Sequence, residues 1–390
     1  MFKHWMTLLV VLALPPATFA ADGAQLYSGT IGRMDVVAEL DLSDPGRITG
    51  RYFYRKYLHD LRLEGTAQGA RLSLREGRHR YGDETRPELR LQRTARGWQG
   101  EWLGLQGKRL PVELTPLLVE EPPAGAEPFW YRLYAESPYE FLRLKASPLT
   151  PGKRERFMGH DLQWWHEPVS GLAAFEILDG YSQAQLDLIN QRLRERLREE
   201  VIGYHACRLN AGVGWAEFSQ KVTPRLLAAD IVSLSIFTSY DCGGAHPDFG
   251  DAPLTLSART GEPLGLEDLL WVGEGSAFRY RELPNRQPDE GSVSFGVFSG
   301  YRSRDFAPWL VEQWRRIAPF EVPPPGEEDE CDYGDPEMWD FPSWYLGEKG
   351  IVFDPLLPRA DRACEAPEWS VLPYELVRQH PGRLNLRLPE

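Results

Sequence analysis

The stretch Ile231 to Val272, IVSLSIFTSYDCGGAHPDFGDAPLTLSARTGEPLGLEDLLWV, carries the strongest structural pattern in this 390-residue chain. From Val232 to Ile236, apolar residues alternate with serine, which is the period-two pattern of a strand with one buried face. Cys242-Gly243-Gly244 ends this strand, and a second alternation follows before the leucines between Leu266 and Leu270. The stretch therefore predicts two strands followed by the start of a short helix.

Short alternating segments also fill the N-terminal third, from Leu26 to Leu114. They recur roughly every ten residues and are bounded by glycine, a spacing typical of antiparallel strands joined by turns. Charged and amide side chains at the intervening positions favour one solvent-exposed face. We expect an antiparallel β-meander that forms either a small barrel or a curved sheet.

Two later segments have helical periodicity. Ser182 and Gln185 have the spacing of a capping box, and apolar residues then recur every three or four positions up to Val201. The arginines and glutamates between them favour a solvated face. Ser303 to Ile317 is the second expected helix, whereas Phe129 to Leu144 has a strand-like rhythm. The expected fold class is α+β, with the meander followed by an α+β domain of two main helices on an antiparallel sheet.

The expected domain organisation follows from composition. Residues 1–20 have the basic start, apolar core and small-residue end of a signal peptide, so a mature chain would begin at Ala21. Residues 21–118 form the expected β-meander domain, and the acidic, proline-rich 119–128 the linker. Residues 129–390 form the α+β domain. We expect a periplasmic or secreted protein with no membrane span after cleavage of the signal peptide.

Four cysteines fit that compartment, because an even number without a C-x-x-C pair favours disulfides over a metal or redox site. Four cysteines allow three connectivities. We expect Cys207–Cys242 and Cys331–Cys364, since each pairs a loop with a neighbouring element and lies within one half of the α+β domain.

The formal net charge is −13, and loss of Lys3 with residues 1–20 makes it −14. An acidic chain does not offer the basic face that nucleic acid requires. It favours a cationic partner, although acidic composition also serves solubility alone.

Asp241, His246, Asp248 and Asp251 form the strongest candidate for chemistry, because acids and a histidine on one loop can hold a metal ion or polarise a water molecule. The alternative is that the glycines form a turn and His246 satisfies a backbone carbonyl. The chain contains no G-x-S-x-G, P-loop, dinucleotide or H-E-x-x-H motif. We therefore expect a non-enzyme without a cofactor.

Several short matches, which occur in the same order along the chain, give this sequence a resemblance to the family known as domain of unknown function 3298. This family is found at the extracellular end of lysozyme-sensing anti-sigma factors and beside a peptidoglycan deacetylase domain. The similar segment runs from Phe129 to Leu388, with Ile177 to Leu193 matching the helix that precedes the domain. The matching residues are Tyr240, Gly243 to Pro247, Thr260-Gly261, Leu266 to Leu270, Gly350 to Phe353 and Pro373 to Leu376. The chain departs from the family at Leu356 and Leu357, and at the insertion with Cys364.

This resemblance implies a binding protein, because the lysozyme-sensing relatives bind a lysozyme through surface loops. The expected function is an exported cell-envelope binding protein whose ligand is a cationic protein, such as a lysozyme-like hydrolase, or a peptidoglycan fragment. Its expected steering patch consists of Glu327, Glu328, Asp329 and Glu330. The alternative is a metal-dependent envelope hydrolase using His246 with Asp241 or Asp248.

Overall fold

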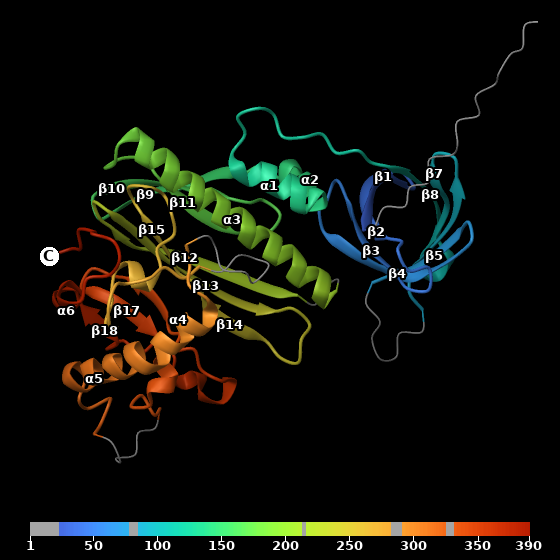
Figure 1. Ribbon diagram of the computed structural model, residues 1–390. Helices are drawn as coiled ribbons and strands as arrows, with labels where there is room; N and C mark the ends of the chain where they lie inside the picture. The colour runs from blue at the N-terminus through green and yellow to red at the C-terminus, as the bar shows by residue number, and fades with distance from the viewer. Residues whose placement is uncertain (1–22, 78–84, 213–215, 282–290, 325–330) are drawn as a thin grey trace, which may run out of the picture. The chain divides into compact units, whose positions relative to one another are not determined.

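The computed structural model describes residues 23–77, 85–212, 216–281, 291–324 and 331–390. The expected signal peptide, residues 1–20, lies outside these ranges. The chain forms two compact units. The first comprises residues up to Leu118 except Tyr57–Asp60, and the second comprises Tyr57–Asp60 and Val119–Glu390 (Figure 1).

The first unit is a closed barrel of eight strands that pair in chain order. The strands are β1 Ala24–Ile31, β2 Met34–Asp41, β3 Ile48–Tyr54, β4 Asp60–Gln68, β5 Arg71–Glu76, β6 Glu88–Thr94, β7 Gly97–Leu103 and β8 Arg109–Pro116. Antiparallel pairing of β1 with β8, from Tyr27 opposite Pro116 to Ile31 opposite Val112, closes the barrel. Of the two expected forms of the meander, the chain therefore adopts the barrel rather than the curved sheet.

Inward side chains from all eight strands fill the barrel, which explains the alternating sequence pattern. The buried set is Tyr27, Ile31, Val36, Ala38, Leu40, Ile48, Tyr52, Leu63, Leu72, Leu74, Leu89, Leu91, Trp98, Val112 and Leu114. Glycine is required where neighbouring strands approach closely. A Cβ on Gly29 would lie 1.8 Å from the carbonyl oxygen of Glu113, and one on Gly100 would lie 1.9 Å from that of Arg90.

The second unit is α+β and contains three antiparallel sheets. One has the order β11-β10-β9, the second β12-β13-β14 with β15 also on β13, and the third β16-β17-β18. The strands are β9 Thr150–Phe157, β10 His160–His166, β11 Ala173–Ile177, β12 Glu217–Leu227, β13 Ile231–Asp241, β14 Asp248–Asp251, β15 Leu254–Ser257, β16 Ser343–Leu346, β17 Gly350–Asp354 and β18 Val371–Pro373. The helical elements are α1 Pro128–Glu136, α2 Pro138–Ala146, α3 Gln183–Ala211, η2 Leu266–Asp268, α4 Phe295–Tyr301, η3 Arg302–Phe306, α5 Ala307–Ile317, η4 Pro336–Trp339, η5 Arg359–Cys364 and α6 Tyr374–Gln379. The α+β class expected from the sequence is confirmed.

The prediction of strand-like structure from Phe129 to Leu144 was wrong, because this segment forms α1 and α2. Each helix begins with a proline, Pro128 or Pro138, whose fixed φ suits the first helical position. In α1 the buried residues are Phe129 and Leu133, four positions apart, which is a helical spacing. The segment is rich in aromatic residues, so apolar positions recur at both the helical and the strand spacing. The sequence pattern therefore did not distinguish a helix from a strand here.

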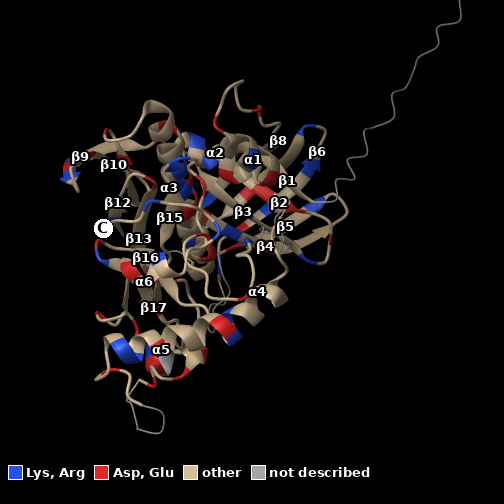
Figure 2. Ribbon diagram, turned by 60° about the vertical axis from the view of Figure 1, so that its left-hand side comes forward, with Lys and Arg blue, Asp and Glu red and all other residues tan. Residues whose placement is uncertain are grey.

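The predicted helix that begins after Ser182 is α3, which continues to Ala211. Its capping box is present, since the Ser182 side chain accepts from the backbone N–H of Gln185 while the Gln185 side chain accepts from that of Ser182. The first half of α3 packs its apolar stripe on β10, β11, β13 and β15, and its second half packs on α1 and α2. Basic and acidic residues both occur along it (Figure 2).

The second expected helix, Ser303 to Ile317, corresponds to most of the π-helical turn η3 and to α5, and η3 joins α5 to α4. Pro308 lacks the N–H that a regular helix would use at this point. The buried faces of Phe306, Leu310 and Trp314 pack on β17, β18 and α6 in the largest core of the chain. Among the described residues, no helix combines the length and apolar character needed to cross a membrane.

Candidate functional site

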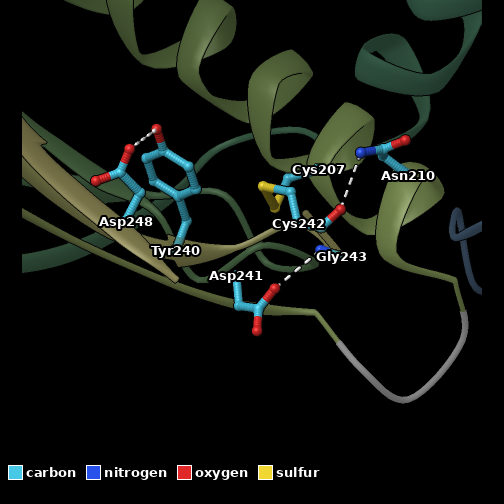
Figure 3. The surroundings of a disulfide bond; sticks show 7 residues. All are labelled: Cys207, Asn210, Tyr240, Asp241, Cys242, Gly243 and Asp248. Carbon is cyan, nitrogen blue, oxygen red and sulfur yellow. Dashed lines mark hydrogen bonds between the residues drawn. A yellow bond between two sulfur atoms is a disulfide. The ribbon is translucent and has the colours of Figure 1, made fainter. Parts of the chain in front are cut away.

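Both predicted disulfides are present, joining Cys207 to Cys242 and Cys331 to Cys364. The first ties the last turns of α3 to the residue that follows β13 (Figure 3). Asn210, one turn after Cys207, donates from its side-chain amide to the carbonyl oxygen of Cys242 at 2.9 Å. The glycine turn at the centre of the Ile231 to Val272 stretch is therefore held against α3.

The candidate catalytic residues on this turn each have a different partner. Asp241 accepts from the backbone N–H of Gly243 at 2.9 Å, whereas Asp248 lies beside the hydroxyl of Tyr240 (Figure 3). Asp248 also pairs with Arg362 at 2.5 Å. His246 is exposed, and its Nδ1 lies 3.0 Å from the carbonyl oxygen of Pro247.

Asp251, the fourth residue of that cluster, accepts from the backbone N–H of Ile236 at 2.8 Å, and burial raises its pKa. Within the described ranges, no group of three or more histidine, cysteine, aspartate or glutamate side chains is arranged to hold a metal ion. The expected steering residues Glu327, Glu328, Asp329 and Glu330 lie outside the described residues.

A large cavity of about 670 Å³ lies elsewhere in the second unit, beside the second half of α3. Its lining comes from five separate segments of the chain. These residues are Pro122, Pro123, Gly125, Ala126, Glu127, Trp130, Phe141, Leu144, Lys145, Ser147, Pro148, Leu149, Trp165, Glu167, Glu176, Arg194, Arg198 and Val201. A volume of this size and a mainly apolar lining are typical of small-molecule and side-chain binding sites.

Four charged groups of this cavity form one network centred on Glu127, namely Glu127, Glu176, Arg194 and Arg198. Arg194 donates to Glu127 from Nε at 3.0 Å and Nη2 at 2.8 Å, and Arg198 donates to the other carboxylate oxygen. Burial opposes ionisation of Glu127, but the hydrogen bonds and charges of the two arginines outweigh it and lower its pKa. Arg194 also pairs with Glu176, which accepts from the indole N–H of Trp165 at 2.9 Å.

Aromatic rings cover the positive side of this network. The guanidinium of Arg198 lies 4.5 Å from the ring centre of Trp130, and the ammonium of Lys145 lies 5.5 Å from that of Phe141. Lys145 is exposed and has no ion-pair partner among the described residues. The cavity therefore presents aromatic and aliphatic surface, with its arginines already neutralised by carboxylates.

Glu167, another carboxylate of the cavity lining, is bound by neighbouring groups of the fold. Glu167, the acid that faces Ser147, also accepts from the backbone N–H groups of Val169 and Ser170 and so braces a turn. The lining contains no histidine or cysteine. Apart from the ammonium of Lys145, its charged groups are paired with neighbouring groups, so a ligand would contact mainly the apolar walls.

Sequence reasoning did not find this cavity. It assigned the arginines of α3 to a solvated face and Glu127 to the linker, yet Arg194, Arg198 and Glu127 form an ion-pair network. Two features of the sequence pointed there, namely Trp130 beside the linker and an arginine pair spaced by four along one helix face.

Comparison with known proteins found similarity to a solved structure. No family model matches the chain, and no curated protein matches it. Among solved structures, the chain is similar to a member of the duf3298 family from Bacteroides fragilis, with 13% sequence identity and a TM-score of 0.33. The match covers 60% of this chain and 92% of that one. That structure is described as a member of the family that the sequence resembles.

Proposed function

We propose that this chain is an exported binding protein of the cell envelope, and that its partner is a protein whose apolar side chain enters the cavity beside α3. The observation that carries the proposal is the cavity itself, whose walls are mainly apolar and whose arginines are paired internally. Deep, well-packed apolar pockets are where a few anchor side chains provide most of the affinity of a protein interface.

The overall charge supports a cationic partner. A chain with a formal charge of −13 attracts a basic protein over long range, and this attraction speeds the encounter more than it tightens the complex. The acidic run from Glu327 to Glu330 would contribute to this steering. Charge therefore would bring the partner to the surface, and the cavity would supply the apolar anchor.

Export is supported by the two disulfides, because such bonds persist in oxidising compartments. The apolar lining favours a protein side chain over a peptidoglycan fragment, whose sugars are covered with hydroxyl groups. Within the proposal, the partner is a basic envelope protein such as a lysozyme-like hydrolase.

Blocking the cavity tests the proposal. Ala126 lines the cavity and is half-buried, so Ala126→Trp would place an indole where the partner's side chain enters. With a cationic lysozyme as the probe, we expect calorimetric titration at low salt to show binding that Ala126→Trp weakens by about tenfold or more. The matched variant Ala126→Ser should bind as the wild type does.

The salt dependence of binding distinguishes long-range electrostatic attraction from apolar contact in the cavity. Raising the ionic strength should lower the association rate for the wild type and both variants alike, since long-range attraction is screened. The absence of any complex at low salt would exclude the lysozyme as the partner. Equal affinity of the wild type and Ala126→Trp would exclude the cavity as its site.

A further inference from the structure

A second cleft, of about 340 Å³, lies in the same unit but shares no residue with the cavity beside α3. Its walls come from β15 and the segment after it, from η2, from the π-helical turn η3 and from β16. The residues that matter for its chemistry are Arg302, Glu267, Trp344, Leu254 and Leu264. Its volume lies within the range of roughly 300–1,000 Å³ that is usual for small-molecule sites.

Arg302 is the first unusual feature of this cleft. Only 4% of the residue is exposed, and its Nε forms an ion pair with Glu267 at 2.7 Å. Its Nη1 is also buried and has no hydrogen-bond partner among the described residues. A buried guanidinium N–H without an acceptor is costly, so polar partners of Arg302 are worth more here than at an exposed site.

The backbone around Arg302 is unusual as well. Arg302 is the first residue of the π-helical turn Arg302–Phe306, and such turns occur frequently at functional sites. The guanidinium packs on Phe298 and Phe306, at 5.0 and 4.6 Å from their ring centres, which fixes its plane. Its position is therefore set in advance rather than adopted on binding.

Trp344 is the second feature. It is half-buried on β16 and lines the cleft. In the described parts of the chain its ring stacks on no other ring, and its indole N–H has no acceptor. An indole placed in this way offers both an apolar face and one donor to a ligand.

The charged groups of the cleft restrict the chemical class of ligand that it can bind. Glu267 is 4% exposed and neutralises Arg302, so an anion entering the cleft would meet a carboxylate as well as a guanidinium. A cation would meet the guanidinium. A neutral ligand with many hydroxyl groups avoids both repulsions, because it can donate to Glu267 and accept from Arg302.

We propose that this cleft is a binding site for a neutral saccharide, whose ring face stacks on Trp344 and whose hydroxyl groups bond to Arg302 and Glu267. A pyranose ring has C–H bonds on its face and hydroxyl groups at its rim, which matches an indole wall beside a charged pair. The site does not depend on the proposed protein partner of the other cavity, and loss of either activity leaves the other measurable.

The test uses the full oxidised chain and four tetrasaccharide probes, namely chitotetraose, cellotetraose, maltotetraose and mannotetraose. We expect at least one to bind in calorimetric titration and to quench tryptophan fluorescence. Trp344→Phe should weaken that binding by about three- to tenfold, since stacking on a smaller ring is weaker. Trp309→Phe is the matched control, because Trp309 is a half-buried tryptophan outside the cleft that contacts His380.

A second variant keeps the proposal testable if Trp344→Phe alters folding. A Cβ added at Gly265 would meet nothing closer than 3.7 Å, so the backbone there can carry a side chain without a clash. Gly265→Leu should fill the cleft and abolish binding, with an unchanged melting temperature. Binding of none of the four probes, or binding that survives both Trp344→Phe and Gly265→Leu, would overturn the proposal.

Discussion

Asp354, at the end of β17, is a carboxyl group whose surroundings favour its neutral form. Burial raises its pKa to about 6, with smaller contributions from the negative charges of Glu365 and Asp251. The backbone N–H of Ala366 donates to it at 2.5 Å and partly offsets this rise. Because the folded-state pKa lies above the unfolded one, Asp354 contributes stability below about pH 4 that is lost as the pH rises through about 6.

Asp354→Asn should therefore stabilise the protein at alkaline pH. The amide keeps an acceptor for Ala366 but carries no charge, so we expect a gain of about 1 kcal/mol at about pH 8 and no gain at about pH 4. Urea unfolding at the two pH values measures this. Asp187→Asn, on the exposed side of α3, is the control. A gain that is the same at both pH values would contradict the assignment to this carboxyl group.

Ser233 and Ser235 show a limit of predicting burial from the alternating pattern of a strand. Alternation in β13 predicts one buried face, and the apolar residues from Val232 to Ile236 are indeed buried. The serines on the other face are buried as well, at 0% and 2% exposure. Ser233 bonds to Thr255 at 2.8 Å and accepts from the backbone N–H of Leu346 at 3.0 Å. Hydroxyl groups fit a buried face when other elements supply such partners.

At the scale of the elements, α3 connects most features of the second unit. Its first half packs on two sheets, its middle carries Arg194 and Arg198 to the cavity, and its last turns carry Cys207 to the disulfide. The helix begins at a capping box, which satisfies backbone donors that would otherwise lack partners.

Removal of the cap should therefore destabilise the second unit. Ser182→Ala loses the acceptor for the backbone N–H of Gln185, and we expect a decrease of about 1 kcal/mol in the free energy of unfolding. Chemical denaturation measures it. Ser276→Ala, at an exposed loop position, should have no effect. Equal stability of the two variants would mean that packing alone holds the start of α3.

At the scale of the whole molecule, contacts distant in sequence hold the chain together. Asp230, in the turn between β12 and β13, has a side chain that is 1% exposed, and it pairs with Arg259 at 2.6 Å and with Arg387 at 3.0 Å. The hydrogen bonds from both arginines lower its pKa. The contacts of Arg387 with Asp230 therefore link the C-terminal segment to the sheet that contains β12 and β13, across a sequence separation of 157 residues.

The two disulfides make a further prediction at this scale. Thiol titration of the exported, unreduced protein in denaturant should detect no free sulfhydryl, since all four cysteines are paired. Reduction should lower stability by about 3 kcal/mol for each bond, because each closes a loop of more than 30 residues, with separations of 35 and 33. Titration of four free sulfhydryls would contradict both the pairing and the proposed export.

The fold was predictable from the sequence to the extent that its signals are local. The strand alternation of the N-terminal third, the capping box at Ser182 and the even number of cysteines each depend on a few neighbouring residues. At Phe129 to Leu144 the local signal failed, because a segment rich in aromatic residues satisfies both the helical and the strand period. The candidate sites were not predictable, since Arg302 and Trp344 lie far from Glu267 in sequence.

The sequence by itself determined the α+β class, the β-meander and the main helices, because hydrophobic periodicity and capping act between residues a few positions apart. The tertiary structure alone decided that the meander closes, since β1 and β8 pair across more than 80 residues, with Thr115 and Ser28 separated by 87. It also decided where a ligand can bind. The cavity beside α3 and the second cleft each take their walls from five segments, and only folding brings those side chains together.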